Sequence, residues 1–253
     1  VLLGIATKVI TAAKEQTKEL DKQRVALGKT SGLFGQFNQQ LTDSTAAAAR
    51  FGKGTAEVGA TIGSLANGMM NFTQMTQANQ KTLIDGSLAL QQFGVDAAQS
   101  AKANDFLLNS LGKSAEEAVD YQKGLIELGA EIGMSGAMLV EQFGSMSGDL
   151  AKFGDQGVKT FKDLARVSKI TGLEVERLLS ITNKFDTFAG AAEQAGKLNA
   201  ALGGNFVNAM DMMMDTDPVS RFEQLRDAIS STGLTFDDMS YYQRQFFANA
   251  MGL

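Results

Sequence analysis

The sequence predicts an all-α protein, and three observations lead to this. The chain has one proline in 253 residues, so almost nothing in it forbids helix. A heptad pattern without charges runs from Leu2 to Met146 when every third and then fourth residue is taken. Beyond Phe93, glycine-centred triplets followed by helix-capping residues recur. We therefore expect long coiled-coil helices in the N-terminal part and short helices or helical hairpins in the C-terminal part.

The uncharged heptad positions form a line along the predicted helices, which we call the seam. The seam is clearest between Phe34 and Phe93, and it suggests that several copies of the chain pack together. The residues beside the seam are small or uncharged, such as Gly52, Gly59 and Gly68, whereas two-stranded coiled coils usually carry Glu and Lys there. A broad face of small residues suits three or more closely packed helices, most simply a homotrimer. The predicted oligomer seam consists of Phe34, Phe37, Leu41, Phe51, Val58, Ile62, Leu65, Met69, Phe72, Leu83, Leu90 and Phe93.

Residues 1–93 are predicted to form this coiled-coil rod. Glycines between Gly28 and Gly35 leave a loop between two helices as an equal alternative to a continuous rod. The stretch from Val58 to Gln80 has no charged residue and is long enough to span a membrane. Its many Asn and Gln side chains favour the apolar interior of a helical bundle instead.

Residues 94–253 are predicted to be a helical-hairpin region that continues beyond the sequence given. Glycines end helices and caps start new ones, as where Ser114 and Glu117 form a capping box after Gly112. Because the glycine spacing nearly preserves the heptad phase, the sequence does not separate a rod from hairpins over residues 94–150, although short helices are favoured there. Later helices are expected over Val158–Ile170, Leu173–Phe188, Ala189–Leu202 and Asn205–Met214, with further starts at Asp217-Pro218 and at the Ser240–Gln243 capping box.

The composition points away from catalysis. Without Cys or His there is no thiolate nucleophile, no imidazole base and no Cys or His zinc site. A pI of 4.9 argues against a phosphate-neutralising surface for nucleic acid. We predict no enzyme activity, no cofactor, no metal site and no catalytic residue.

Three local motifs have simpler interpretations than ligand binding. Asp211, Asp215 and Asp217 lack the glycine turn and later carboxylate of a cation loop, so we interpret them as helix caps. The methionine-rich run 210–214 is expected mainly to fill core, although an adaptable contact surface is the alternative. Gly203-Gly204-Asn205 is expected to be a turn.

Three stretches resemble the tail tape measure proteins of tailed bacteriophages. They are Gly133-Met134-Ser135, Gly172-Leu173-Glu174 and, above all, the closing segment Ser240–Leu253. The resemblance implies a structural virion protein in the tail tube lumen, present as a homotrimer or homohexamer. It would contact tail tube and tail tip or baseplate proteins, set tail length during assembly, and leave ahead of the DNA. The host membrane would be a further partner during ejection, and no sequence-specific nucleic acid is implied.

Two other classes of function remain open on the sequence. The uncharged stretch from Val58 to Gln80 and the glycine-rich helices would also suit an envelope-penetrating or pore-forming protein. The heptad pattern would also suit a cellular coiled-coil scaffold.

Overall fold

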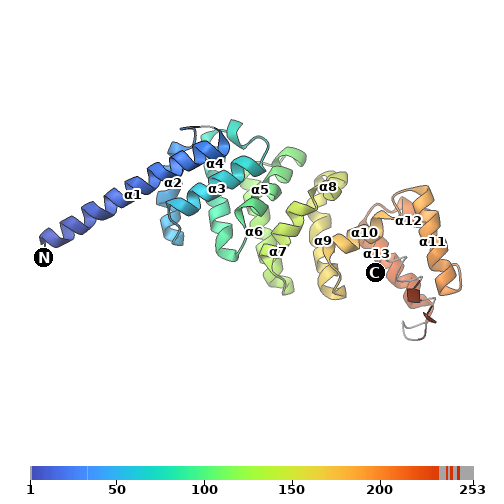
Figure 1. Ribbon diagram of the computed structural model, residues 1–253. Helices are drawn as coiled ribbons and strands as arrows, with labels where there is room; N and C mark the ends of the chain where they lie inside the picture. The colour runs from blue at the N-terminus through green and yellow to red at the C-terminus, as the bar shows by residue number, and fades with distance from the viewer. Residues whose placement is uncertain (1, 33, 234–237, 239, 242–243, 246–253) are drawn as a thin grey trace. The chain divides into compact units, whose positions relative to one another are not determined.

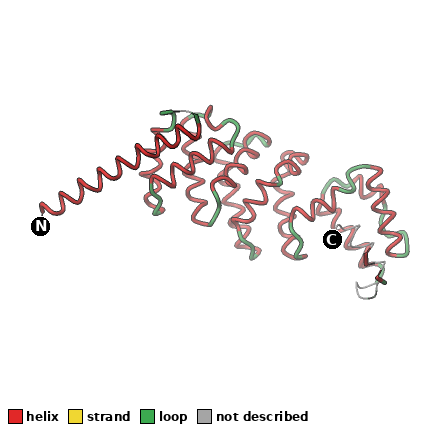
Figure 2. The backbone as a smooth tube through the Cα atoms, in the orientation of Figure 1, coloured by secondary structure: helices red, strands yellow, loops and turns green. Residues whose placement is uncertain are grey.

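The protein is described from a computed structural model, which covers residues 2–32, 34–233, 238, 240–241 and 244–245, with side chains from Thr11 onward except Ser31. Every regular element in these residues is helical, so the all-α prediction is confirmed (Figure 2). The α-helices are α1 (Leu2–Ser31), α2 (Asn38–Ala48), α3 (Thr55–Gly68), α4 (Gln77–Leu90), α5 (Ala97–Asp105), α6 (Ala115–Ile132), α7 (Gly136–Ser145), α8 (Ser147–Leu150), α9 (Gly157–Thr171), α10 (Val175–Asn183), α11 (Phe188–Leu202), α12 (Ala209–Met214) and α13 (Pro218–Ser231). Shorter helical turns of other types are η1 (Ala49–Phe51), η2 (Phe72–Gln74), η3 (Gln91–Phe93), η4 (Phe106–Ser110) and η5 (Ala151–Gln156).

The chain forms two compact units, Val1–Gly154 and Asp155–Leu253. In the first unit, α1, α3, α5 and α7 pack side by side in one row, and α2, α4 and α6 form a second row against it (Figure 1). Helices on both sides of Phe93 are in contact, since α3 packs on α5 and α4 packs on α6. The predicted division at residue 93 is therefore not a boundary between compact units.

Left-handed glycines set the turns of this array. Gly52, Gly94 and Gly133 have φ values of 68°, 86° and 69°, and α3, α5 and α7 each begin three residues later. Gly112 precedes α6 in the same way, and the predicted capping box of Ser114 and Glu117 is present. Residues with a Cβ rarely adopt this backbone conformation, so glycine fixes the place of each turn. The prediction that the glycine-centred triplets form turns between helices is thus confirmed.

The predicted rod over residues 1–93 is wrong, because this stretch contains four α-helices and not one. Gly32 and Gly35, with φ of 71° and 83°, end α1, and Gly52 separates α2 from α3. Of the two alternatives at Gly28–Gly35, the loop is the one observed. Buried residues on either side of these breaks still fall on the heptad positions, which makes a stack of hairpins look like a rod in the sequence.

The predicted oligomer seam faces the interior of a single chain. Nine of its twelve members are no more than 3% exposed, namely Phe37, Leu41, Val58, Ile62, Leu65, Met69, Phe72, Leu83 and Leu90. Phe51 is half-buried, while Phe34 and Phe93 are 71% and 61% exposed. Packing between the two rows of one chain explains the absence of charges from the seam, so it does not require a trimer.

Two glycines, Gly68 beside the seam and Gly86 on a heptad position of the seam, serve packing within the chain. A Cβ at Gly68 would lie 2.8 Å from the Ala101 Cβ, and one at Gly86 would lie 2.5 Å from Val119 Cγ2. Real Cβ atoms do not approach other atoms so closely, so these glycines let neighbouring helices of the array come together. They give no separate support to an oligomer.

The second unit is a smaller helical cluster. Helices α9, α10 and α13 pack on one another, and α11 packs on α12. The predicted helices 158–170 and 189–202 are confirmed as α9 and α11. Phe185 is buried as expected, whereas Phe188, predicted on the same apolar side, is 66% exposed because it begins α11.

A pair of glycine substitutions tests this account of helix packing. In Gly129→Ala, the new Cβ would lie 2.6 Å from the Gly136 backbone nitrogen, and we expect a loss of about 2–3 kcal/mol in the free energy of unfolding. The control is Gly196→Ala, where no atom lies within 4 Å and helix propensity predicts a gain of up to about 1 kcal/mol. Urea denaturation followed by circular dichroism measures both. Equal effects at the two sites would contradict the packing role of Gly129.

Candidate interaction groove

The outer face of α3 is the floor of a groove in the first unit. Gly59, Ala60, Gly63, Ser64 and Asn67 line it, and none of them carries a large apolar side chain or a charge. Their spacing of one, three and four residues places them on one side of the helix. The floor therefore lies below the neighbouring helices.

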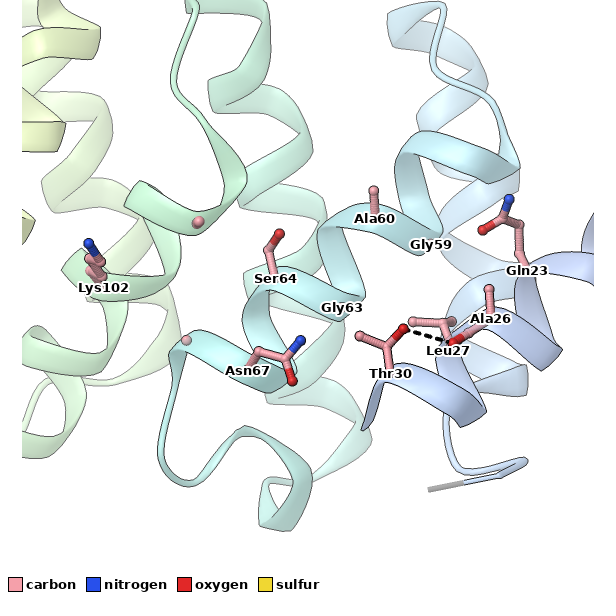
Figure 3. Close-up of a pocket in the computed structure, with 12 residues that line it drawn as sticks. Gln23, Ala26, Leu27, Thr30, Gly59, Ala60, Gly63, Ser64, Asn67 and Lys102 are labelled. Atoms are coloured by element: carbon pink, nitrogen blue, oxygen red, sulfur yellow. Dashed lines mark hydrogen bonds between the residues drawn. The ribbon is translucent and has the colours of Figure 1, made fainter. Parts of the chain in front are cut away.

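Helices α1 and α5 are the walls of this groove (Figure 3). The α1 wall carries Gln23, Ala26, Leu27 and Thr30, and the Thr30 hydroxyl donates to the Ala26 carbonyl at 2.9 Å. Lys102 stands on the α5 wall. The groove has a volume of about 540 Å³, which is large enough for side chains of a partner protein.

A second hollow continues the groove along the array. It has a volume of about 470 Å³ and shares Gly68 and Lys102 with the first. Further small residues, including Gly144, Ser145 and Gly148, line it on the α7 and α8 side. The two hollows together make a surface that crosses several helices and is lined mainly by small, uncharged residues, with charges at Lys102 and Asp105.

The two charges in the groove differ in their partners. The Asp105 carboxylate accepts hydrogen bonds from the Met70 backbone N–H at 2.7 Å and from Asn109 Nδ2 at 2.6 Å, so its charge already serves the fold. Lys102 is exposed, and its ammonium group has no hydrogen bond or ion pair within the described part of the chain. The groove therefore offers a single available cation to a partner.

Buried amide pairs hold the helices beneath the groove in register. Gln40 Nε2 donates to Gln80 Oε1 at 2.6 Å, and Gln80 Nε2 donates to the Phe72 carbonyl at 2.8 Å. Gln122 Nε2 likewise donates to Asn104 Oδ1 at 2.6 Å, joining α6 to α5. All four amides are at most 4% exposed. These residues were not predicted, although Gln and Asn within an apolar periodic pattern were the available signal.

Two titratable groups in the first unit have shifted pKa values with clear physical causes. Burial in the core raises the pKa of the Tyr121 phenol well above its ordinary value. Hydrogen bonds from the Ser114 backbone and side chain lower the pKa of the Glu117 carboxyl, as expected for a capping box at a helix N-terminus. Neither group lines the groove, so the two pKa shifts reflect contacts that stabilise the fold.

Two of the three aspartates singled out in the sequence, Asp215 and Asp217, lie at the start of α13, whereas Asp211 is not a cap and lies in the first turn of α12, which Asn208 caps. Asp217 accepts from the Val219 backbone N–H at 2.9 Å and begins α13, as predicted. The Asp215 carboxylate accepts from the Asp217 backbone N–H at 3.0 Å and from Gln224 Nε2 at 2.6 Å. Among the described residues, no group of three or more acidic, His or Cys side chains could hold a metal ion.

The other C-terminal motifs also contribute to structure. In the methionine run, Met212 is buried, but Met210 and Met214 are 47% and 71% exposed, so the run is only partly core. Gly203 ends α11 with φ of 76°, which confirms the predicted turn. The predicted capping box at Ser240–Gln243 lies outside the described residues, because Gln243 is not described.

One residue central to the second unit was not predicted at all. Arg221 is 4% exposed and lies between α10, α12 and α13. Its guanidinium donates to the carbonyls of Met212 at 2.8 Å and Thr182 at 2.9 Å, and to the Asp186 carboxylate. In the sequence, Arg221 looks like an ordinary charge on the solvent face of a helix.

With this geometry established, the chain was compared with known protein families, curated proteins and solved structures. None of the three comparisons finds a match. In the described part of the chain, no helix combines the length and apolarity needed to cross a bilayer.

Proposed function

We propose that this chain is a structural segment of the tail tape measure protein of a tailed bacteriophage. The resemblance in the glycine-centred triplets and the closing segment supports this, together with the helical, cysteine-free and histidine-free chain. In this role the protein lies in the tail tube lumen with further copies of itself, contributes to tail length, and leaves before the DNA.

The observation that carries the proposal is the regular advance of the array. Helices α3, α5 and α7 lie side by side in one row and begin 42 and then 39 residues apart, at Thr55, Ala97 and Gly136. Neighbouring packed helices lie about 8–10 Å apart. The array therefore gains about 10 Å for every 40 residues or so, and its length is set by the number of hairpins. In the proposed role, the length of the stacked array, and not the length of a continuous coiled coil, contributes to the length of the tail.

Inserting extra hairpins tests the role in tail length. The segment from Lys53 to Gly94 contains α3 and α4, and it begins and ends at equivalent left-handed glycine turns. Four additional copies should lengthen the tail by about 40 Å if they stay folded as an array, because each adds one layer of helices. The same 168 residues would add about 250 Å if they were drawn out as continuous helix. Electron microscopy of the assembled tails measures the difference.

The control is a chain of native length that carries substitutions only on exposed positions of α6, and its tails should keep the native length. Tails of native length from the lengthened chain would reject the proposal for this segment, provided that mass spectrometry finds the chain in the particles.

A binding scaffold in the host cell is the second candidate, and the continuous groove favours it. Stacked helical hairpins present extended surfaces of this kind to partner proteins. Antibody labelling separates the two: label inside disrupted tails supports the tape measure role, whereas label confined to the cell supports the scaffold.

A further inference from the structure

The last two residues of α3, Asn67 and Gly68, form an Asn-Gly pair. Asn67 is exposed and lines the groove (Figure 3). Its carboxamide makes no hydrogen bond within the described part of the chain. Asparagine is one of the thermally labile residue types, and a side chain that bonds to no other group is free to react with its own backbone.

Gly68 makes this reaction accessible. Packing requires glycine here, since a Cβ would lie 2.8 Å from the Ala101 Cβ on α5. The same missing Cβ leaves the Gly68 nitrogen unshielded toward the side chain that precedes it. The contact between α3 and α5 thus places the smallest possible neighbour after an exposed asparagine.

The end of the helix decides whether the two groups can meet. Within an α-helix, the backbone N–H is held in its hydrogen bond and away from the side-chain carbon of the preceding residue. Met69, directly after α3, already has an extended backbone, with φ of −122° and ψ of 130°. Terminal turns of helices open more readily than their interiors. Opening this one turn, without unfolding the array, brings the Gly68 nitrogen to the Asn67 side chain.

A related pair inside another helix shows the contrast. Asp85 and Gly86 lie within α4, and Asp-Gly can close the same ring with loss of water. Gly86 is buried against Val119, and the Asp85 carboxylate is paired with Lys81. The closed helix and the ion pair hold these groups apart, so we expect reaction at Asn67 and not at Asp85.

We propose that Asn67-Gly68 is a deamidation site of the folded chain, which places a new carboxylate in the groove that holds Lys102. The Gly68 nitrogen attacks the Asn67 Cγ and loses its proton, the amide nitrogen leaves as ammonia, and a succinimide ring forms. Solvent water then adds to one of the two ring carbonyls and opens the ring to aspartate or isoaspartate. The net reaction consumes one water and releases one ammonia, and it needs no oxidant or reductant.

The product changes the groove in two ways. Lys102 is the available cation there, so a carboxylate at position 67 offsets its charge. The isoaspartyl form also adds a backbone methylene next to Gly68, where α3 and α5 approach closely. The site does not depend on the phage assignment, because it is measured on the purified chain while the proposed function is measured by tail length.

Ageing the purified full chain at mildly alkaline pH tests the site. Peptide mapping by mass spectrometry should find aspartate and isoaspartate at position 67, formed several-fold faster than at any other asparagine of the described residues. Asn67→Gln should abolish this product, since glutamine closes the corresponding larger ring far more slowly. The matched control Asn38→Gln changes another exposed asparagine and should leave the rate at position 67 unaltered. A residue 67 that stays amidated, or that reacts no faster than Asn38, would overturn the proposal.

Low concentrations of urea show whether the folded chain is the one that reacts. Opening one helical turn exposes little surface, so the rate at position 67 should stay nearly constant below the unfolding transition. Circular dichroism of the same samples gives the unfolded fraction. A rate that rises in proportion to that fraction would refute a site in the folded chain.

Discussion

Replacing Phe72 with alanine is expected to lower the free energy of unfolding of the first unit by about 4 kcal/mol. Phe72 is fully buried, and its ring stacks on Phe37 with centroids 5.8 Å apart. Removing it leaves a cavity between α2, α3 and α4 that the close-packed array cannot fill. The matched control is Phe93→Ala, which removes the same side chain from a position that is 61% exposed and should change the free energy by no more than about 0.5 kcal/mol.

The same experiment separates a core within one chain from a seam between chains. Urea denaturation is followed by circular dichroism at protein concentrations spanning two orders of magnitude. A core within one chain gives a midpoint that does not depend on concentration, whereas an oligomer seam gives a midpoint that rises with it. A rising midpoint, or a Phe93 effect as large as that of Phe72, would restore the trimer interpretation.

Local signals in the sequence identified most of the helix ends. The capping residues Asp96, Ser114, Ser135 and Asp217 all accept the backbone hydrogen bonds expected of them. These signals depend on a few neighbouring residues, so they can be recognised without knowledge of the rest of the fold. The apolar residues of the core were identified for the same reason.

Which helix packs on which could not be predicted, because the heptad frame carries no information about where the chain reverses. Leu65 and Leu83 are both seam residues in that frame, whether they face a second copy or a neighbouring hairpin. The groove was missed because its floor depends on α1 and α5 standing on either side of α3. Of the two glycines of α3 that line the groove floor, Gly59 and Gly63, only Gly59 is closely approached, with its Cβ position 2.8 Å from Gln23 Oε1.

Arg221 is expected to dominate the stability of the second unit. In Arg221→Ala, the carbonyls of the buried residues Met212 and Thr182 lose their donor, and the exposed Asp186 carboxylate loses its cation. Unsatisfied groups of this kind cost more than the original hydrogen bonds contributed, so we expect a loss of about 3 kcal/mol. Hydrogen exchange of the α10 and α13 amides, together with urea denaturation, measures the effect.

Two further variants distinguish the guanidinium geometry from charge alone. Arg221→Lys keeps the charge but cannot reach acceptors on α10 and α12 at once, because an ammonium is a single point and the guanidinium is a planar fork. It should therefore recover less than half of the lost stability. Arg226→Ala removes an exposed arginine of the same helix that pairs with the adjacent Asp227, and it should change stability by no more than about 0.5 kcal/mol. If Arg221→Lys were as stable as the native chain, a buried positive charge alone would be sufficient for the stability of the second unit. The claim that one planar guanidinium joins α10, α12 and α13 would then be wrong.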